Sequence, residues 1–226
     1  MNRVIAAILL VLLWCASSLA ADHFIDSSCT HNGTGHAGSC AASSGAAGAW
    51  NSFASANSHS YAAGDDIYLK CGSTFTSQRL APAISGDATD PDNINYSMIG
   101  AYYGTGTIGV LGARPIISGN TRTYPTEGSY TALVDITSGR DYTHITNLHV
   151  VGSGGIGIQV QGTSTNQAVG NRITDCYVAS TYRHGIRLIC NVHYSTVDGN
   201  EVTDTGWSRF KDRKSTRLNS SHRIRS

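Results

Sequence analysis

The chain has 226 residues and a formal net charge of +1, and 14% of its residues are charged, against about 25% in an average soluble domain. The low charge argues against a charge-rich disordered chain, and the low Leu and Lys content argues against a helical bundle. The chain also has 25 glycines and many small polar residues among β-branched ones. They favour an all-β protein with many turns. With so small a net charge we expect no nucleic-acid partner.

Residues 1–21 have the pattern of a secretion signal. Arg3 supplies a positive start, residues 4–14 are apolar without interruption, and Ala20 and Ala21 are small residues suited to cleavage. The apolar run is too short for a membrane anchor. We therefore expect an extracellular or periplasmic protein that has no membrane attachment after cleavage.

Residues 22–63 are predicted to form an N-terminal cap region that contains one helix. Residues 46–57 contain four positions that are spaced as on one face of a helix: Trp50, Phe53, Ala54 and Asn57. So short and Ser-rich a helix is not stable alone, so it needs an apolar surface to pack on.

Cysteine positions predict one disulfide and leave others open. Cys29 and Cys40 bracket a Gly-rich loop and are the expected pair, with Cys71 as the competitor. Cys176 and Cys190 are a second candidate pair. No CxxC spacing occurs, which argues against a zinc site.

From residue 64 onward, the chain consists of short β-rich segments separated by Gly, Asn and Asp turns. The expected strands cover residues 67–70, 97–101, 108–111, 115–118 and 133–136. A repeat follows: residues 144–151 match 172–179 at a shift of 28, and residues 157–160 match 185–188 at the same shift. A third copy begins at residue 197, shifted by 24. Repeats of this length built from short strands indicate a solenoid, here a parallel β-helix over residues 64–211.

Residues 212–226 form a basic tail unlike the rest of the chain. Residues 212–222 match the translation of a widely used sequencing adapter, so we expect residues 212–226 to be an artefact and the coils to be incomplete. Without the signal and this tail, residues 22–211 hold 10 Lys and Arg against 14 Asp and Glu.

Three stretches, residues 64–75 (GDDIYLKCGSTF), 99–102 and 114–119, resemble the opening of secreted proteins of the pectin-lyase-like superfamily. The later repeats look like generic coils of that family. The resemblance covers residues 22–208 and implies an all-β, right-handed parallel β-helix solenoid, truncated at its C-terminus. It also implies a short N-terminal capping helix that contains Trp50 and Phe53. These motifs are specific for the fold and not for one activity.

A basic cluster is the strongest candidate for chemistry. Arg187 is expected on the outer face of a strand, and Tyr182, Arg183 and His184 on the bend before it. Arg183 and Arg187 are predicted to bind a carboxylate, since a guanidinium does so through a bidentate fork. His184 and Tyr182 are predicted to move the proton, with Arg187 as a third catalytic residue. The competing interpretation is that both arginines are simply solvated and that His184 is a turn residue.

Carboxylates on adjacent coils are the second candidate. Asp175, Asp198, Glu201 and Asp204 would bind Ca²⁺ only if they stacked in one column. In the repeat alignment Asp198 stacks on Thr174 and Glu201 on Tyr177, and Asp175 is expected to point inward. Ca²⁺ therefore remains an option only, and no cofactor and no metal ligand is assigned.

The predicted function is that of a secreted, monomeric polysaccharide lyase acting on a uronate-containing glycan. In lyases of the resembled family, the uronate carboxylate is neutralised and a basic side chain removes the C5 proton. A glycoside hydrolase on the same fold is the alternative, but the pair of carboxylates that it requires is not visible, since Asp65 and Asp66 fall in a turn. A non-catalytic surface or adhesion module that binds glycans is the second alternative.

Overall fold

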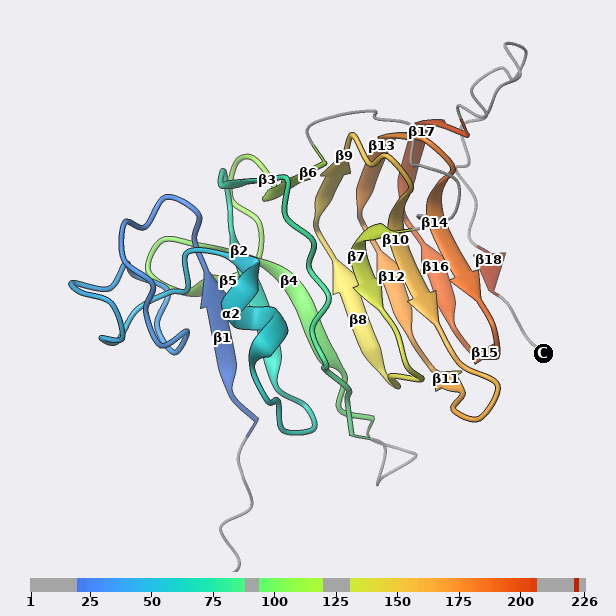
Figure 1. The fold of residues 1–226 in the computed structure, drawn as a ribbon, viewed down its shortest axis with the longest axis horizontal. Helices are drawn as coiled ribbons and strands as arrows, with labels where there is room; N and C mark the ends of the chain where they lie inside the picture. Colours follow the sequence, from blue (N-terminus) through green and yellow to red (C-terminus); the bar gives the residue numbers. More distant parts are fainter. Residues whose placement is uncertain (1–19, 88–93, 120–130, 207–221, 224–226) are drawn as a thin grey trace, which may run out of the picture.

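The computed structural model describes residues 20–87, 94–119, 131–206 and 222–223, whose regular secondary structure is almost entirely β-strand (Figure 1). Residues 1–19 of the predicted signal sequence lie outside the described residues. So does the predicted artefact tail, apart from His222–Arg223, which pairs antiparallel with Thr196 and Val197. The described chain forms a parallel β-helix, as the sequence predicted.

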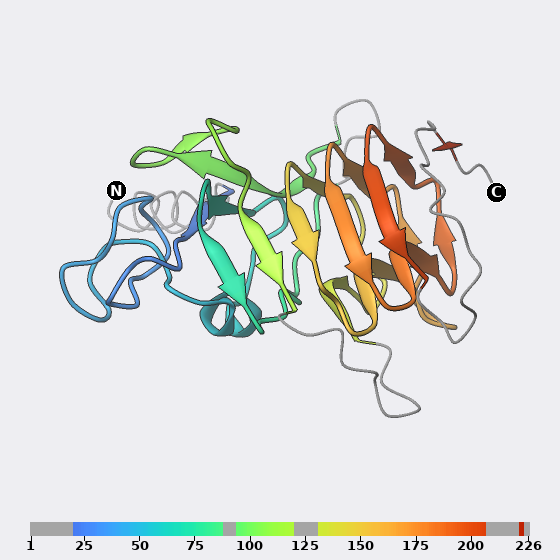
Figure 2. The ribbon, with the colours of Figure 1, turned by 90° about the horizontal axis from the view of Figure 1, so that it is seen from above.

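The described strands assemble into four sheets, of eight, five, three and two strands, because successive coils add strands to the same faces of the solenoid (Figures 1 and 2). The largest sheet contains β1 (Asp22–Ile25), β2 (Asp66–Lys70), β4 (Ser97–Tyr103), β8 (Thr143–Thr146), β12 (Arg172–Thr174), β16 (Thr196–Asp198) and β18 (His222–Arg223), with β5 (Thr107–Ile108) antiparallel to β4. A second sheet contains β3 (Thr74–Thr76), β6 (Ile116–Ser118), β9 (His149–Val151), β13 (Tyr177–Thr181) and β17 (Glu201–Thr205). A third contains β7 (Ala132–Ile136), β10 (Ile156–Gln161) and β14 (His184–Ile189), and the fourth pairs β11 (Ala168–Val169) with β15 (Val192–His193).

Strand pairing follows the sequence repeat. Ile145 of β8 pairs with Ile173 of β12, a shift of 28 residues, and Ile173 pairs with Val197 of β16, a shift of 24. The same shift of 28 places Ile158 of β10 beside Ile186 of β14. The predicted coil alignment is therefore confirmed strand by strand.

Left-handed residues stack at the bend between the first and second strand of successive coils. Asn147, Asp175 and Gly199 occupy equivalent positions and have φ values of 59°, 52° and 63°. Gly adopts this conformation without strain, and Asn and Asp tolerate it better than other side chains do. The prediction that Asp175 points inward is wrong: its side chain is exposed and lies over Gly199, because the left-handed turn aims it outward.

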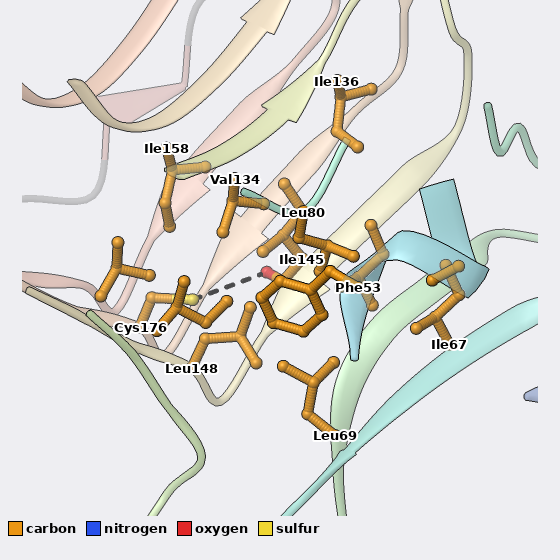
Figure 3. Packing of buried hydrophobic residues seen from close by; sticks show 14 of the residues in the cluster. Phe53, Ile67, Leu69, Leu80, Val134, Ile136, Ile145, Leu148, Ile158 and Cys176 are labelled. Carbon is orange, nitrogen blue, oxygen red and sulfur yellow. Dashed lines mark hydrogen bonds between the residues drawn. The ribbon is translucent and has the colours of Figure 1, made fainter. Parts of the chain in front are cut away.

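Apolar side chains from successive coils stack along the inside of the helix (Figure 3). One ladder follows the largest sheet through Ile67, Ile99, Ile145 and Ile173, which are 0–1% exposed. Full burial of one such side chain contributes about 1.5–3 kcal/mol, so the stacked interior is the main source of stability.

The N-terminal helix is shorter than predicted. Helix α2 covers Phe53–Ser58, and Trp50 precedes it. The Trp50 N–H donates to the Phe24 carbonyl (2.9 Å) and the Trp50 carbonyl accepts from Asp26 N–H (2.8 Å), so its backbone pairs with β1 and cannot be helical. The buried face is formed by Phe53 and Ala56, whereas the predicted face residues Ala54 and Asn57 are exposed.

The cysteine prediction is confirmed for one pair. Cys29 and Cys40 form a disulfide that closes the Gly-rich loop between them. Cys71, Cys176 and Cys190 are free thiols, so the second candidate pair does not form. Cys176 is buried in the apolar interior while Cys190 is exposed, which explains why the two do not meet.

Candidate active site

The predicted basic cluster lies at the corner between β13 and β14. Tyr182 and Arg183 form the bend, and His184 is the first residue of β14. The bend rests on the coil before it, since Tyr182 N–H donates to the Ser153 carbonyl and Arg183 N–H to the Gly155 carbonyl, both at 2.9 Å. The backbone of the preceding coil therefore positions the corner.

His184 is exposed, and its electrostatic surroundings suit proton transfer. Partial burial, followed by the charges of Arg187 and Arg183, lowers the pKa of the imidazole below its usual value of 6.5. His184 is therefore neutral at neutral pH and has a nitrogen lone pair that can accept a proton. Both guanidinium groups lie close enough to act on this ring, so the structure brings His184, Arg183 and Arg187 together.

Arg187 belongs to a row of polar side chains that crosses the sheet of β7, β10 and β14. Strand register places Arg187 beside Gln159 and Gln159 beside Asp135. Gln159 Nε2 donates to Asp135 Oδ1 at 3.2 Å, and Arg79 forms an ion pair with Asp135. His184 lies in another row of the same sheet, opposite Ile156.

Sequence reasoning missed the first members of this row, Arg79, Asp135 and Gln159. Asp135 is 3% and Gln159 5% exposed, although each lies between two inward-pointing apolar neighbours in its strand. The sequence did contain information about Gln159, because the shift of 28 that aligns the coils also aligns Gln159 with Arg187. Burial of the two side chains could not be read from the strand alternation, which predicts exposure for outward positions.

The acidic residues considered for Ca²⁺ do not form a site. Asp175, Asp198 and Glu201 are exposed on separate turns and strands, and Ser180 Oγ donates to Asp204 at 2.9 Å. Within the residues that the structure describes, none of these carboxylates gathers with others into a group with metal-ligand spacing. The arrangement does not fit a calcium ion, and no reaction step is assigned to one.

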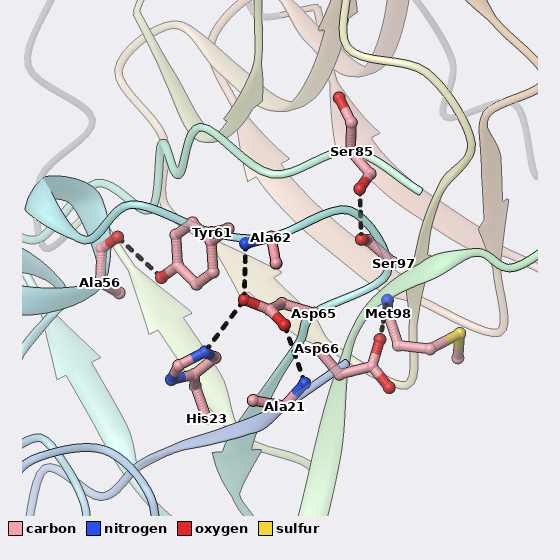
Figure 4. A network of polar contacts seen from close by, with 10 residues as sticks. All are labelled: Ala21, His23, Ala56, Tyr61, Ala62, Asp65, Asp66, Ser85, Ser97 and Met98. Carbon is pink, nitrogen blue, oxygen red and sulfur yellow. Dashed lines mark hydrogen bonds and ion pairs between the residues drawn. The ribbon is translucent and has the colours of Figure 1, made fainter. Parts of the chain in front are cut away.

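A second cluster of titratable side chains lies near the N-terminus, and Figure 4 shows two of its members, His23 and Asp65. It contains His23 of β1, His59 after α2, and Asp65 before β2. Burial above all, and then the neighbouring His59, lowers the pKa of His23. The sequence predicted a simple turn at Asp65, but this carboxylate is 4% exposed and accepts two backbone hydrogen bonds, from Ala21 and Ala62.

Comparisons with known proteins support the fold. No protein-family model matches the chain, and no curated protein matches it. Similar solved structures include two of the GH136 lacto-N-biosidase from Eubacterium ramulus, a selenomethionine derivative and the native protein. They align over 82% of this chain with TM-scores of 0.57 and 0.54 and identities of 15% and 14%. The chain spans 36% and 34% of those structures, about a third of their length, and at this identity the similarity establishes the β-helix fold.

Among the residues whose positions are described, no helix has the length and apolar character needed to cross a membrane.

Proposed function

We propose that the chain belongs to a secreted carbohydrate-active protein of the pectin-lyase-like type, and that the corner between β13 and β14 carries out polysaccharide lyase chemistry on a uronate-containing glycan. The observation that carries the proposal is the position of His184 at the start of β14 beside Arg183 and near Arg187, whose charges, after partial burial, lower the pKa of the imidazole. Most of the chain is mildly acidic, so this basic corner is a local exception that suits an acidic polymer. The Cys29–Cys40 disulfide is compatible with an oxidising, extracellular location, where the protein would act as a monomer.

Arg183 and Arg187 would bind the substrate carboxylate. Charge-assisted hydrogen bonds from a guanidinium to a carboxylate are about twice as strong as neutral ones and fix its orientation. Neutralising the carboxylate makes the proton on C5 of the uronate more acidic, because the electron density left on that carbon is drawn toward the carboxyl group. These arginines would therefore both hold the sugar and lower the barrier to proton removal.

His184 and Tyr182 would transfer the protons. His184 takes the C5 proton, the electrons of that bond form the C4–C5 double bond, and the C4–O4 bond breaks. Tyr182 donates its phenolic proton to the departing oxygen. A positioned acid or base contributes about 10²–10⁴-fold to the rate, so both groups are needed for measurable turnover.

Mutation of the corner tests this proposal. His184→Ala and Arg187→Ala are each expected to lower the release of unsaturated uronides from acidic polysaccharides by at least about 100-fold, measured by ultraviolet absorbance of the new double bond. His31→Ala and Arg172→Ala, at exposed positions elsewhere in the chain, serve as matched controls and should keep wild-type activity. Unchanged activity in both corner variants would remove these residues from the mechanism.

A glycoside hydrolase is the second candidate, favoured by the GH136 lacto-N-biosidase structures that share the fold. Hydrolysis commonly requires two carboxylates on opposite sides of the glycosidic bond. The polar row provides one, Asp135, already paired with Arg79. Reducing ends that appear without a double bond would favour this candidate, and glycan binding without turnover would favour an adhesion module; either result contradicts the lyase.

A further inference from the structure

The N-terminal cluster contains a buried imidazole with unmet hydrogen-bonding capacity. His23 is 1% exposed, and neither of its ring nitrogens has a hydrogen-bond partner. Its Nε2 lies 3.5 Å from Asp65 Oδ2, too far for a good hydrogen bond (Figure 4). Leaving a buried polar atom without a partner costs about 1–3 kcal/mol, so this side chain requires a physical explanation.

Three metal-ligating groups converge at this point. One ring nitrogen of His23, one of His59 and one carboxylate oxygen of Asp65 all lie within 4.8 Å of one another. A tetrahedral ion with bonds of about 2.0–2.1 Å separates its ligand atoms by about 3.3 Å. The 3.5 Å between His23 and Asp65 is already close to this value, so only a small movement of His59 completes the geometry.

The surrounding residues hold the ligands in place. Asp65 Oδ2 accepts from the Ala62 N–H, which remains after the predicted cleavage, and Oδ1 accepts from the N–H of Ala21, the residue at the cleavage point, each at 2.8 Å. Such second contacts orient a ligating carboxylate and raise the affinity for a metal. The indole ring of Trp50 stacks on His23 with ring centroids 5.2 Å apart and an angle of 7°, which fixes the plane of the imidazole.

Tyr61 packs against both the apolar core and this cluster. Its ring meets His23 and His59 edge-on, with centroids 5.2 Å and 4.8 Å away, and its hydroxyl donates to the Ala56 carbonyl. Tyr61 is therefore anchored and does not compete for the nitrogens of His23. His36, which is exposed, has its ring 5.0 Å from that of His23, so the cluster adjoins a side chain in contact with solvent.

We propose that His23, His59 and Asp65 bind a divalent transition-metal ion, with Zn²⁺ as the best match. Two imidazoles and one carboxylate are ligands that zinc accepts, and three protein ligands leave a fourth position for water. The ion joins β1, the segment after α2 and the turn before β2, so it braces the cap region. No local motif reveals the site, because its ligands lie 36 and 6 residues apart in the sequence.

Zinc titration of the full chain tests the proposal. The protein, carrying an affinity tag without histidines, is freed of metal and titrated with Zn²⁺ against a chromophoric chelator. We expect one ion per chain at submicromolar affinity. His59→Gln should weaken binding by more than about 100-fold, because losing even an outer-shell partner commonly costs 10–100-fold. His31→Gln, in the exposed part of the same region, is the matched control and should bind as the wild type does.

Two further measurements distinguish a metal site from a cluster in which His23 and His59 have only a structural role. Zn²⁺ should raise the thermal unfolding temperature of the wild type and of His31→Gln but not of His59→Gln. Co²⁺ should give a tetrahedral visible absorption band that requires His59. Absence of stoichiometric zinc binding, or equal binding by wild type and His59→Gln, would overturn the proposal and would leave His23 as a buried structural histidine beside Asp65. Loss of lyase activity in the corner variants bears only on the proposed function, so the two proposals fail separately.

Discussion

The coils from residue 143 to 205 and the cap region are stabilised in different ways. In the coils, each contact recurs: Ile145 stacks on Ile173, which stacks on Val197, at shifts of 28 and 24. In the cap region contacts occur once, such as the Cys29–Cys40 disulfide and the stacking of Trp50 on His23. Because the contacts between coils repeat, the stability of a solenoid is nearly the sum of the contributions of its coils. In the cap region, where each contact occurs once, we expect the loss of one contact to destabilise the whole region. The difference predicts where one substitution acts locally and where it does not.

The largest effect is expected in the cap region at Phe53. This ring is 1% exposed and stacks on Phe75 with centroids 4.4 Å apart. Phe53→Ala should lower the free energy of unfolding by about 3–5 kcal/mol, measured by urea denaturation. Ala54→Ser, at an exposed position in the same helix, is the control and should change it by less than about 0.5 kcal/mol. Equal effects from both variants would show that α2 does not pack on the core.

Removing the disulfide should come next. The double variant Cys29→Ser/Cys40→Ser is expected to lose about 2–4 kcal/mol, chiefly because the unfolded chain gains freedom. Hydrogen exchange should show faster opening of β1, with little change in β12 and β13. If all strands lost protection equally, the cap region and the coils would form one cooperative unit and the contrast between them would not hold.

A polar contact between coils should have a smaller effect. Asn200 Oδ1 accepts from the Cys176 N–H at 2.9 Å, and its Nδ2 donates to the Ile173 carbonyl at 2.8 Å. Asn200→Ala leaves both backbone groups without these partners and should cost about 1–3 kcal/mol. Asn166→Ala, at an exposed position, is the matched control. A thermal shift no larger than that of the control would show that water replaces the amide.

The smallest effect is expected from His144 and depends on pH. Burial, and then the charge of Arg172, lowers the pKa of this ring below 6.5, while Asp175 opposes the shift. Its Nε2 also contacts Thr174 Oγ1 at 2.8 Å, with Tyr96 beside it. The unfolded chain then binds more protons, so this contribution to stability is present above the unfolded value of about 6.5 and is lost as the pH falls below it.

His144→Gln should therefore flatten the fall in thermal stability on acidification. The quantity to compare is the difference in unfolding temperature between variant and wild type at each pH, since other buried histidines contribute equally to both proteins. An unchanged slope between neutral and mildly acidic pH would mean that His144 titrates alike in the folded and unfolded chains.

The sequence predicted the coils better than the cap region or the row of polar side chains. The pattern around Asn147, Asp175 and Gly199 encodes the bend locally, so alignment of the repeats was sufficient to find the strand register. The predicted helix was longer than α2, because the backbone of Trp50 pairs with β1, which is distant in sequence, and so does not become helical despite its helical spacing. The burial of Asp65 could not be foreseen either, since only the fold brings Ala21 and Ala62 to its carboxylate.

At the basic corner too, the sequence revealed contacts between chain neighbours but not contacts between coils. The sequence placed Arg183, His184 and Arg187 together because they are neighbours in the chain. The row from Arg187 through Gln159 to Asp135 crosses strands of three coils, so it required the register of the sheet. Residue type and local spacing therefore suggested the chemistry, and the stacking of coils added the polar side chains beside it.

Mass analysis of the products from an acidic polysaccharide is the most direct test of the proposed function. β-Elimination at the corner of His184 and Arg187 predicts oligosaccharides whose new non-reducing end is an unsaturated uronide, one water lighter than the corresponding hydrolysis product. Saturated products, or an intact polysaccharide that the chain only binds, would contradict the lyase.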